Sequence, residues 1–279
     1  MLNEAPGTLY LVATPIGNLG DISFRAVETL RQVDFIAAED TRVTRKLLNH
    51  LEIKKPLISF HEHNSRESGE KILARMLNGE SCALVTDAGM PCISDPGEDI
   101  TRICSEAGIP ITAIPGPCAA VTALALSGIP AGRFVFEGFL STAKKSRFER
   151  LEELKAEQRT MIFYEAPHKL MRTLNDMLSA FGDRRVSISR ELTKLFEETR
   201  RFTLAEAVKH FEEHPPRGEF VLIIEGIQKA PAPVLQIDDA VSMARTQIEN
   251  GLSVKDAVKI VAEQTGIPKN TLYNAVIKE

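Results

Sequence analysis

The sequence predicts an α/β protein with two sheet domains followed by a small helical module. Short apolar stretches of strand length alternate with helical patterns along residues 1–130 and again along 131–229. Glycine and polar residues gather directly after the strands, as they do at the ligand-binding edge of a parallel sheet. Residues 236–279 show helical patterns alone. The chain has 279 residues, enough for about two domains that each bury a core.

The first domain is predicted over residues 1–130. Its strands are the apolar stretches at residues 8–14, 33–38, 57–60, 82–85 and 111–114. Asp21 or Ser23 can cap a first helix, because Ala26, Val27 and Leu30 follow at helical spacing. Further helices are expected through Leu47 and Leu48 and over residues 67–77, 98–106 and 118–126.

A second α/β domain is predicted over residues 131–229, after a joint at the GIPAGR stretch. Its strands are the stretches at residues 134–139, 160–164, 185–189 and 219–225. Leu151 and Leu154 share one face of a helix expected over residues 147–157. The APAP stretch at residues 230–233 predicts a linker.

The tail, residues 236–279, predicts a helix-turn-helix. Ser253 caps a helix over residues 254–264, TGIP forms the turn, and residues 269–278 form the next helix. Acidic residues slightly outnumber basic ones here, which is a poor match to a nucleic-acid reader. Docking or assembly and RNA contact therefore both remain open for the tail.

Charge limits the kind of partner that the chain can attract. The net charge of -4 provides no overall attraction for nucleic acid, so such binding needs a local patch. Acidic residues outnumber basic ones over residues 1–130, and the reverse holds over residues 133–201. The middle of the chain is therefore the cationic part.

Cysteine usage and the apolar stretches point to a cytoplasmic protein. The 4 cysteines show no CxxC spacing and no histidine cluster, which predicts reduced, buried thiols and no zinc site. His61 and His63 have no third ligand nearby, so no metal site is expected. The MLNEAPG start predicts no secretory signal. Residues 107–132 are uncharged, but their prolines favour a strand, a turn and a helix over a membrane span.

The stretch CALVTDAGMPCISDPG, residues 82–97, is the strongest candidate for a binding site. Its strand ends abruptly in a loop that places Asp87, Gly89 and Ser94 at the carboxyl end of the strand, where α/β sheets bind polar ligands. A tight turn after a buried strand would have the same composition. The glycine fingerprints GxGxxG and GxxxxGK and the nucleophile motif GxSxG are absent.

Several loops together identify a family. They read ATPIGNLGD, AEDTR, FHEHN, TDAGMPCISDPG, IPGPCAAVTALALSGIP, FEGFL, FYEAPHKL and RELTK. With these motifs in this order, the chain resembles methyltransferases of the tetrapyrrole-methylase fold. Among them it resembles those that modify small-subunit ribosomal RNA. The likeness covers nearly the whole chain, with the tail included. It implies two α/β domains with a cofactor cleft between them, S-adenosylmethionine as donor and a homodimer. It further implies that the acceptor is the 2′-hydroxyl of a cytidine in the decoding region, in free ribosomal RNA or in the assembled small subunit.

The resemblance also implies which residues hold the cofactor. Carried over by position, they are Pro15, Asp87, Ala88, Gly89, Ile93, Ser94, Asp95, Cys118, Ala119, Tyr164, Glu165, Ala166, Leu192, Gly218 and Glu219. Small residues in these loops would allow close approach of the backbone to the ligand. Cys118 departs from the hydroxyl residue that porphyrin-modifying relatives carry, and Ser141 departs from the proline expected after FEGFL.

A ribose hydroxyl is a weak nucleophile, so a base or hydrogen-bond acceptor is expected beside it. The candidates at predicted strand ends are Asp40, His61, Glu62 and Glu191. Hydrogen bonds that stabilise loops would account for the same residues. Phosphate contacts are expected from Arg42, Arg45, Lys46, Lys144, Lys145, Arg147 and Arg150. A solvated helix face would have the same composition.

Two other functions remain open at this point. The first is a methyltransferase that acts on a tetrapyrrole of the precorrin type, which would need a wide trough for a flat macrocycle. The second is a non-catalytic ribosome-associated factor that keeps the fold, since a fold does not guarantee a substrate.

Overall fold

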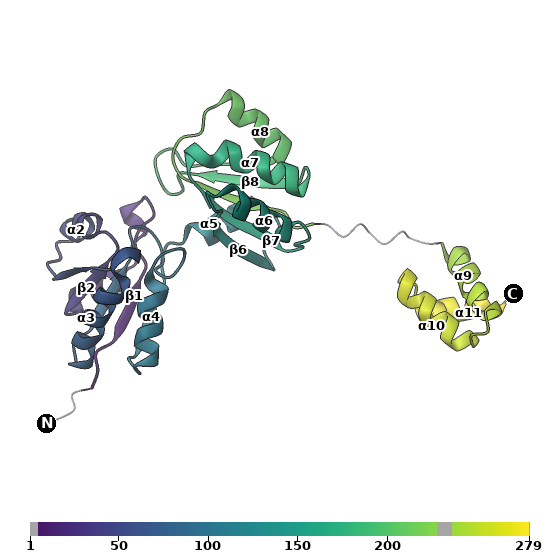
Figure 1. Cartoon of the computed structure of the whole chain (residues 1–279), viewed down its shortest axis with the longest axis horizontal. Helices are drawn as coiled ribbons and strands as arrows, with labels where there is room; N and C mark the ends of the chain where they lie inside the picture. Colours follow the sequence, from purple (N-terminus) through teal and green to yellow (C-terminus); the bar gives the residue numbers. More distant parts are fainter. Residues whose placement is uncertain (1–4, 228–235, 279) are drawn as a thin grey trace. The chain divides into compact units, whose positions relative to one another are not determined.

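The computed structural model describes residues 5–227 and 236–278 (Figure 1). The chain divides into two compact units, residues 1–226 and 227–279. The first unit contains two sheets, and the described residues of the second form helices. The predicted linker at residues 230–233, and the predicted end of the second domain at residue 229, lie outside the described residues.

The first sheet has the order β3-β2-β4-β1-β5, and all its neighbouring strands pair in parallel. Its strands are β1 (Leu9–Val12), β2 (Phe35–Ala38), β3 (Leu57–Ser59), β4 (Cys82–Val85) and β5 (Ile111–Ile114). The helices between them are α1 (Phe24–Gln32), α2 (Thr41–His50), α3 (Ser65–Leu77) and α4 (Gly97–Glu106), with short 3-10 turns η1 (Leu19–Asp21) and η2 (Glu62–Asn64).

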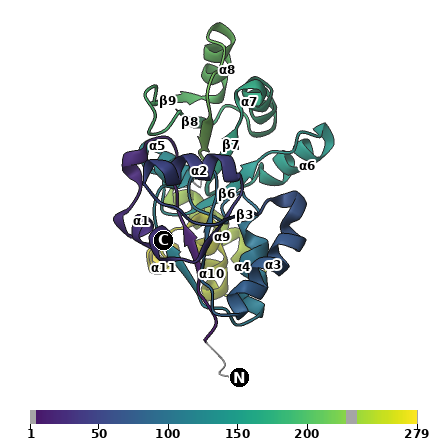
Figure 2. The same cartoon turned by 90° about the vertical axis from the view of Figure 1, so that its left-hand side faces the viewer.

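Helices cover both faces of this sheet. Helices α3 and α4 lie side by side on one face, packed around Phe35 and Leu84 (Figure 2). The other face, with Ile36 and Val85, packs with residues of α1 and α2. Burial on both faces explains why the central strands FIAA and CALV are apolar throughout.

Of the two predicted caps for α1, Ser23 is the correct one, because its hydroxyl accepts from the Ala26 N–H.

The strand order places the loops after β1 and β4 next to each other. An antiparallel bridge joins Thr14 to Gly89, with N–H to carbonyl distances of 2.9 and 3.1 Å. The Thr14 hydroxyl also donates to the Thr86 carbonyl over 3.1 Å. Both loops therefore form one edge of the sheet, at the carboxyl ends of its strands.

The second sheet has the order β6-β7-β10-β8-β9 and is mostly antiparallel, since β6 and β7 form its one parallel pair. Its strands are β6 (Phe134–Phe139), β7 (Thr160–Glu165), β8 (Arg185–Arg190), β9 (Glu198–Thr203) and β10 (Phe220–Ile224). Helices α6 (Lys144–Leu154), α7 (Pro167–Phe181) and α8 (Leu204–Glu213) pack on one face, and α5 (Ala119–Ser127) packs on the other.

Helix α5 packs on the second sheet, although its residues precede the predicted joint at GIPAGR. Ala123 and Leu124 of α5 pack against Ile162 and Ile223 of the sheet. The chain therefore crosses from one sheet to the other at residues 115–118, between β5 and α5. The small and apolar residues of α5 make this close packing possible.

The tail forms its own helical core. Helices α9 (Ile237–Glu249), α10 (Val254–Thr265) and α11 (Lys269–Lys278) pack around Ala244, Val258, Val261 and Leu272. The helical tail expected from the sequence is thus confirmed, and the Ser253 hydroxyl caps α10 by accepting from the Asp256 N–H. Among the described residues, no helix is long and apolar enough to cross a membrane.

Candidate active site

The edges of the two sheets together form a cavity of about 640 Å³. The first sheet contributes residues that follow β2 and β4, and the start of α5 closes one side. The second sheet contributes the last residue of β6, residues at and after the end of β7, and residues in and beside β8 and β10. Gly17, in the loop after β1, lies against the loop after β8, where an added Cβ would meet Lys194 Cγ at 2.4 Å. The cavity therefore lies between loops from both sheets.

Most of the residues predicted to hold the cofactor line this cavity. They are Asp87, Ala88, Gly89, Ile93, Ser94, Asp95, Cys118, Ala119, Tyr164, Glu165, Ala166, Leu192 and Glu219. Pro15 and Gly218 do not line it, whereas Ile16 does. An added Cβ at Gly218 would lie 2.6 Å from Glu191 Cγ, so this glycine makes room for a neighbouring side chain. Cys118 is partly exposed rather than buried, as is Cys92.

Asp95 holds the loop after β4 in its unusual shape. Its Oδ1 accepts from the N–H groups of Cys92 and Gly97 over 3.0 and 2.8 Å, and its Oδ2 accepts from the Ile93 N–H over 3.1 Å. Cys92 and Ser94 both have positive φ, 70° and 66°. Residues other than glycine adopt this conformation at a cost of about 1 kcal/mol each. The carboxylate offsets that cost, and so fixes the wall formed by Ile93 and Ser94.

A group of acidic residues forms the first-sheet side of the cavity. Glu39 Oε2 accepts from the Thr86 hydroxyl over 2.6 Å and from the Asp87 N–H over 3.4 Å. Asp87 Oδ1 accepts from the Asp40 N–H over 3.1 Å. Burial, and after it the nearby Glu39 carboxylate, raise the pKa of Asp87 above its ordinary value. This side of the cavity is therefore suited to a group that carries positive charge or donates hydrogen bonds.

The raised pKa leads to a testable effect on stability. Stability that depends on protonated Asp87 is fully present below the pKa of the unfolded chain, and it is lost as pH rises through the folded-state pKa. We therefore expect Asp87→Asn to stabilise the ligand-free protein at neutral pH, by no more than about 0.5 kcal/mol after solvent screening. Thermal unfolding as a function of pH measures this effect. The difference in stability between Asp87→Asn and the wild type should vanish at acid pH. The control Asp99→Asn on α4 should show no stabilisation that appears only at neutral pH.

The second sheet contributes a rigid aromatic wall. Tyr164 packs against Phe136 and Phe139 with ring centroids 5.2 and 5.5 Å away, and its phenol oxygen accepts from the Ala120 N–H over 3.2 Å. Burial raises the pKa of Tyr164 to about 12. Glu165 is buried and accepts from the Ala166 N–H over 2.8 Å and the Thr173 hydroxyl over 2.5 Å. These groups shape the cavity, and the phenol stays protonated at neutral pH.

The candidate catalytic residues do not line the cavity. Asp40 caps α2 and pairs with Arg42 over 2.6 Å, and this guanidinium lowers the pKa of the carboxyl to about 2. His61 and Glu62 lie at η2 after β3. Glu191 accepts from Lys194 Nζ and from the Glu219 N–H, both over 3.0 Å. Burial opposes the lowering of its pKa, but these hydrogen bonds outweigh burial.

The candidate phosphate contacts fall on α2 and α6, and one of them differs from the rest. Arg147 is 3% exposed. Its Nε donates to Asp176 over 2.7 Å, and its Nη1 donates to the Ser141 and Thr142 carbonyls. The guanidinium is thus occupied inside the protein, so the predicted phosphate contact of Arg147 is corrected to a structural role.

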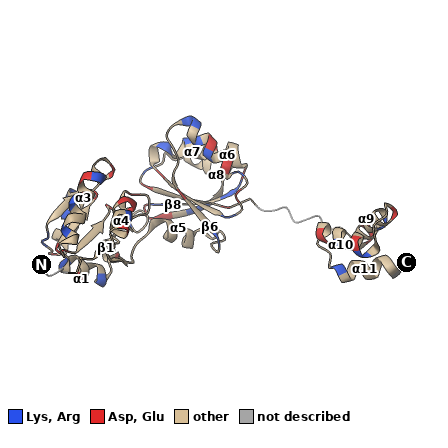
Figure 3. Ribbon diagram, turned by 60° about the horizontal axis from the view of Figure 1, so that its bottom comes forward, with Lys and Arg blue, Asp and Glu red and all other residues tan. Residues whose placement is uncertain are grey.

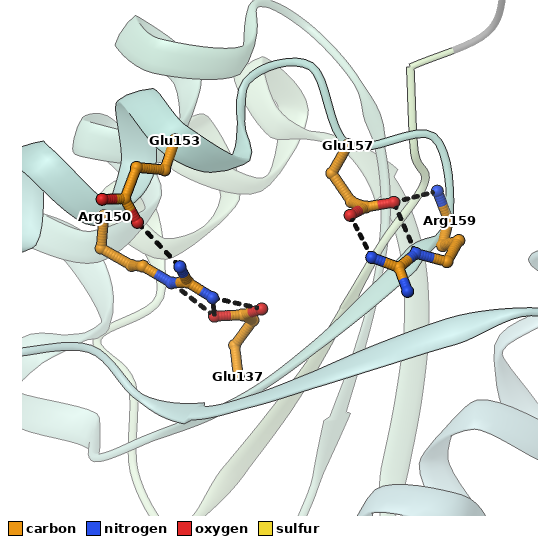
Figure 4. Close-up of polar contacts among 5 residues, drawn as sticks. All are labelled: Glu137, Arg150, Glu153, Glu157 and Arg159. Atoms are coloured by element: carbon orange, nitrogen blue, oxygen red, sulfur yellow. Dashed lines mark hydrogen bonds and ion pairs between the residues drawn. The ribbon is translucent and has the colours of Figure 1, made fainter.

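The other candidates on these helices are exposed. Acidic residues lie among the basic ones on α6 (Figure 3). Arg150 pairs with Glu137 and Glu153, both over 2.8 Å, and Glu157 and Arg159 pair nearby (Figure 4). Arg42, Arg45, Lys46, Lys144 and Lys145 therefore remain the most accessible cations of the set.

Some cavity residues were missed in the sequence. Glu39, Thr86, Met90, Phe139, Pro167, His168, Ser189, Phe220 and Val221 also line the cavity. A signal was present for Glu39, Thr86 and His168, because each follows a strand within one of the loops that carry the resemblance. Which of these side chains points inward depends on packing, which the sequence does not show.

The fold and this cavity define a methylase. The family model "Tetrapyrrole (Corrin/Porphyrin) Methylases" matches residues 8–208, and the chain belongs to this family. A solved structure titled cobalt precorrin-4 methyltransferase aligns with a TM-score of 0.59 and 17% identity, over 78% of this chain and 94% of that one. Diphthine synthase aligns with a TM-score of 0.60 and 13% identity, over 79% and 90%. These structures show the fold alone, and they confirm the predicted tetrapyrrole-methylase architecture.

Relatives with higher sequence identity place the chain in one group within this family. The protein of Halalkalibacterium halodurans named ribosomal RNA small subunit methyltransferase I is 49% identical, over 98% of this chain and 96% of its own length. Proteins of the same name from Bacillus subtilis and Escherichia coli O157:H7 are 45% and 44% identical, over 96% and 99% of this chain. The model "RsmI C-terminal HTH domain" matches residues 238–279. The chain is thus a member of the family that these relatives form.

Proposed function

We propose that the protein transfers a methyl group from S-adenosylmethionine to the 2′-hydroxyl of a cytidine in the decoding region of small-subunit ribosomal RNA. The observation that carries this proposal is the cavity between the two sheet edges, in a chain so similar to relatives named for ribosomal RNA methylation. We further propose that the protein works in the cytoplasm as a homodimer, on free ribosomal RNA or on the assembled small subunit.

The residues of the cavity fit the donor. Among the described residues, Glu39 Oε1 and Asp87 Oδ2 have no hydrogen-bond partner, and both can accept from an ammonium or from ribose hydroxyls. Gly89 has a φ of 91°, and an added Cβ there would lie 3.3 Å from Ile16 Cγ2, so the backbone can approach a ligand closely. When bound, S-adenosylmethionine supplies an electrophilic methyl group.

In this proposal the chain itself supplies alignment and a water-poor wall. Ala88, Gly89, Cys118 and Ala119 would present backbone groups and little bulk to the donor. Tyr164 and the phenylalanines beside it would keep water from the reacting atoms, which favours a step in which positive charge disappears. Holding the two reactants in line accounts for most of the expected acceleration.

A methyl-transfer assay with labelled donor tests the proposal. Purified small ribosomal subunits, free small-subunit RNA and a precorrin are offered in parallel, and the modified nucleotide is mapped. We expect label on one cytidine ribose. Transfer to the precorrin alone would instead identify a tetrapyrrole methylase. Absence of donor binding in calorimetry would point to a non-catalytic ribosome-associated factor.

The exposed cations of α2 and α6 provide a prediction about RNA binding. We expect the combined change Lys144→Gln and Lys145→Gln to weaken RNA binding and to flatten its salt dependence by about 0.7 in log-log slope per lost contact to single-stranded RNA. Fluorescence anisotropy at several salt concentrations measures this. Donor affinity should not change, because neither residue lines the cavity. Lys71→Gln on α3 is the control. An equal loss of RNA affinity in this variant would refute the assignment of RNA binding to the exposed cations of α2 and α6.

A further inference from the structure

The cavity contains more acid-base groups than a methyl transfer needs, and most of them are already bonded. Both oxygens of Asp95 and of Glu165 accept hydrogen bonds from the protein. Glu219 Oε2 pairs with Lys194 Nζ over 3.0 Å. The Tyr164 phenol oxygen accepts from a backbone N–H, and its raised pKa keeps it protonated. Asp95, Glu165 and Tyr164 are therefore not suited to take a proton from an incoming hydroxyl, and the Glu219 carboxylate is committed to Lys194 through one of its oxygens.

Glu39 and Asp87 form a separate group on the first-sheet side. Glu39 Oε2 accepts from the Thr86 hydroxyl and the Asp87 N–H, and Asp87 Oδ1 accepts from the Asp40 N–H. The other oxygen of each carboxylate is the one assigned above to the donor. A carboxylate that neutralises the donor is occupied when the acceptor arrives. The proton acceptor is therefore better sought on the second-sheet side.

Among the described residues, Cys118 and His168 are the remaining titratable side chains that line the cavity, and of the two only the imidazole has a nitrogen that accepts a proton while neutral. His168 comes from the second sheet domain. It follows Pro167, which begins α7 directly after β7, and Leu170 two residues later is fully buried. The proline and this buried turn hold the backbone of His168 in place. The imidazole is exposed, and no hydrogen bond or ion pair of its ring exists within residues 5–227 and 236–278.

This position suits an acceptor that comes from outside. A nucleotide of a large RNA reaches the cavity from solvent, so its hydroxyl meets exposed groups before buried ones. Histidine is also the side chain most often used to take a proton in a reaction near neutral pH.

We propose that His168 accepts the proton of the ribose hydroxyl as the methyl group is transferred. The inference rests on the proposed function. The acceptor oxygen forms a bond to the methyl carbon while the carbon–sulfur bond breaks, and its electron pair stays on sulfur. The hydroxyl proton moves to a ring nitrogen of His168, which later releases it to water. The products are the 2′-O-methyl ribose and S-adenosylhomocysteine, a neutral thioether at sulfur.

The experiment compares His168→Ala and His168→Gln with the wild type in single-turnover methyl transfer to small ribosomal subunits. We expect the rate to fall about 100-fold or more in both variants. Donor and RNA affinities, measured by calorimetry and anisotropy, should stay within about twofold. Added imidazole should restore part of the rate of His168→Ala, because it can occupy the space left by the missing ring. A purely structural role would show no such rescue.

His63→Ala is the matched control, since His63 is an exposed histidine that does not line the cavity. A rate within about threefold of wild type in His168→Ala would overturn the inference and leave the free oxygen of Asp87 as the next candidate base. Loss of donor affinity would overturn it too, because His168 would then hold the donor. If the wild type itself transfers no methyl group to the ribosomal substrate, it is the proposed function that fails.

Discussion

Asp95→Ala should weaken binding of S-adenosylmethionine by about 100-fold while the protein stays folded. The carboxylate accepts three backbone N–H groups of the loop after β4. Hydrogen bonds to a charged group contribute about 1.5–3 kcal/mol each. Without them, Cys92 and Ser94 can leave their positive φ values, and the wall formed by Ile93 and Ser94 relaxes. A loss of about 2.7 kcal/mol in binding corresponds to the stated factor.

Calorimetric titration with the donor measures this effect, and thermal unfolding without ligand checks the fold. Glu98→Ala is the control, because Glu98 is exposed on the first turn of α4 and does not line the cavity. Asp95→Asn keeps one acceptor oxygen, so its affinity for the donor should lie between that of Asp95→Ala and that of the Glu98→Ala control. Donor affinity equal to wild type in Asp95→Ala would show that the loop does not hold the donor.

Arg147→Ala should destabilise the fold by about 3 kcal/mol. The Arg147 and Asp176 side chains are 4% and 16% exposed, and they pair over 2.7 Å between α6 and α7. Removing one partner of a buried pair leaves a charge without compensation, which costs about 3–5 kcal/mol. The same guanidinium also holds the Ser141 and Thr142 carbonyls, so the turn before α6 would lose its anchor.

Arg150→Ala on the same helix is the matched comparison. Its side chain is 47% exposed and pairs with Glu137 and Glu153, so its loss should cost less than about 1 kcal/mol (Figure 4). Chemical denaturation of both variants and the wild type measures the difference. If Arg147→Ala were as stable as Arg150→Ala and failed to bind RNA, the sequence-based interpretation of Arg147 as a phosphate contact would be right.

Local patterns in the sequence predicted much of the first sheet. The strands at residues 82–85 and 111–114 have the same bounds in the structure, because each is a short apolar run between turn residues. In the second sheet, the strand at residues 134–139 also has its predicted bounds. Helices α7 and α8 and strand β9 were missed. Signals for the two helices were present, namely Pro167 at the start of α7 and the capping box of Thr203 and Glu206. Strand β9, ETRRFT, is a polar edge strand with no apolar alternation.

The candidate catalytic residues show where sequence reasoning stops. Asp40 and Asp87 each follow a strand of the first sheet, and the sequence predicted a catalytic role for Asp40 and, through the resemblance, a cofactor contact for Asp87. In the structure Asp40 turns back to cap α2, whereas Asp87 lines the cavity. Position after a strand places a residue at the correct edge of the sheet, but the direction of its side chain depends on neighbours that are distant in sequence.

The sequence by itself determined the alternation of strands and helices, the helical tail and the family, because apolar spacing and loop motifs are local properties of the chain. The tertiary structure alone decided that α5 packs on the second sheet, that Arg147 is buried and that His168 lines the cavity with no hydrogen-bond partner in the described part of the chain. The physical reason is that burial and pairing depend on which distant segments meet. The residues next to a side chain in the sequence do not reveal whether it will contact a carboxylate, a carbonyl or solvent in the folded protein.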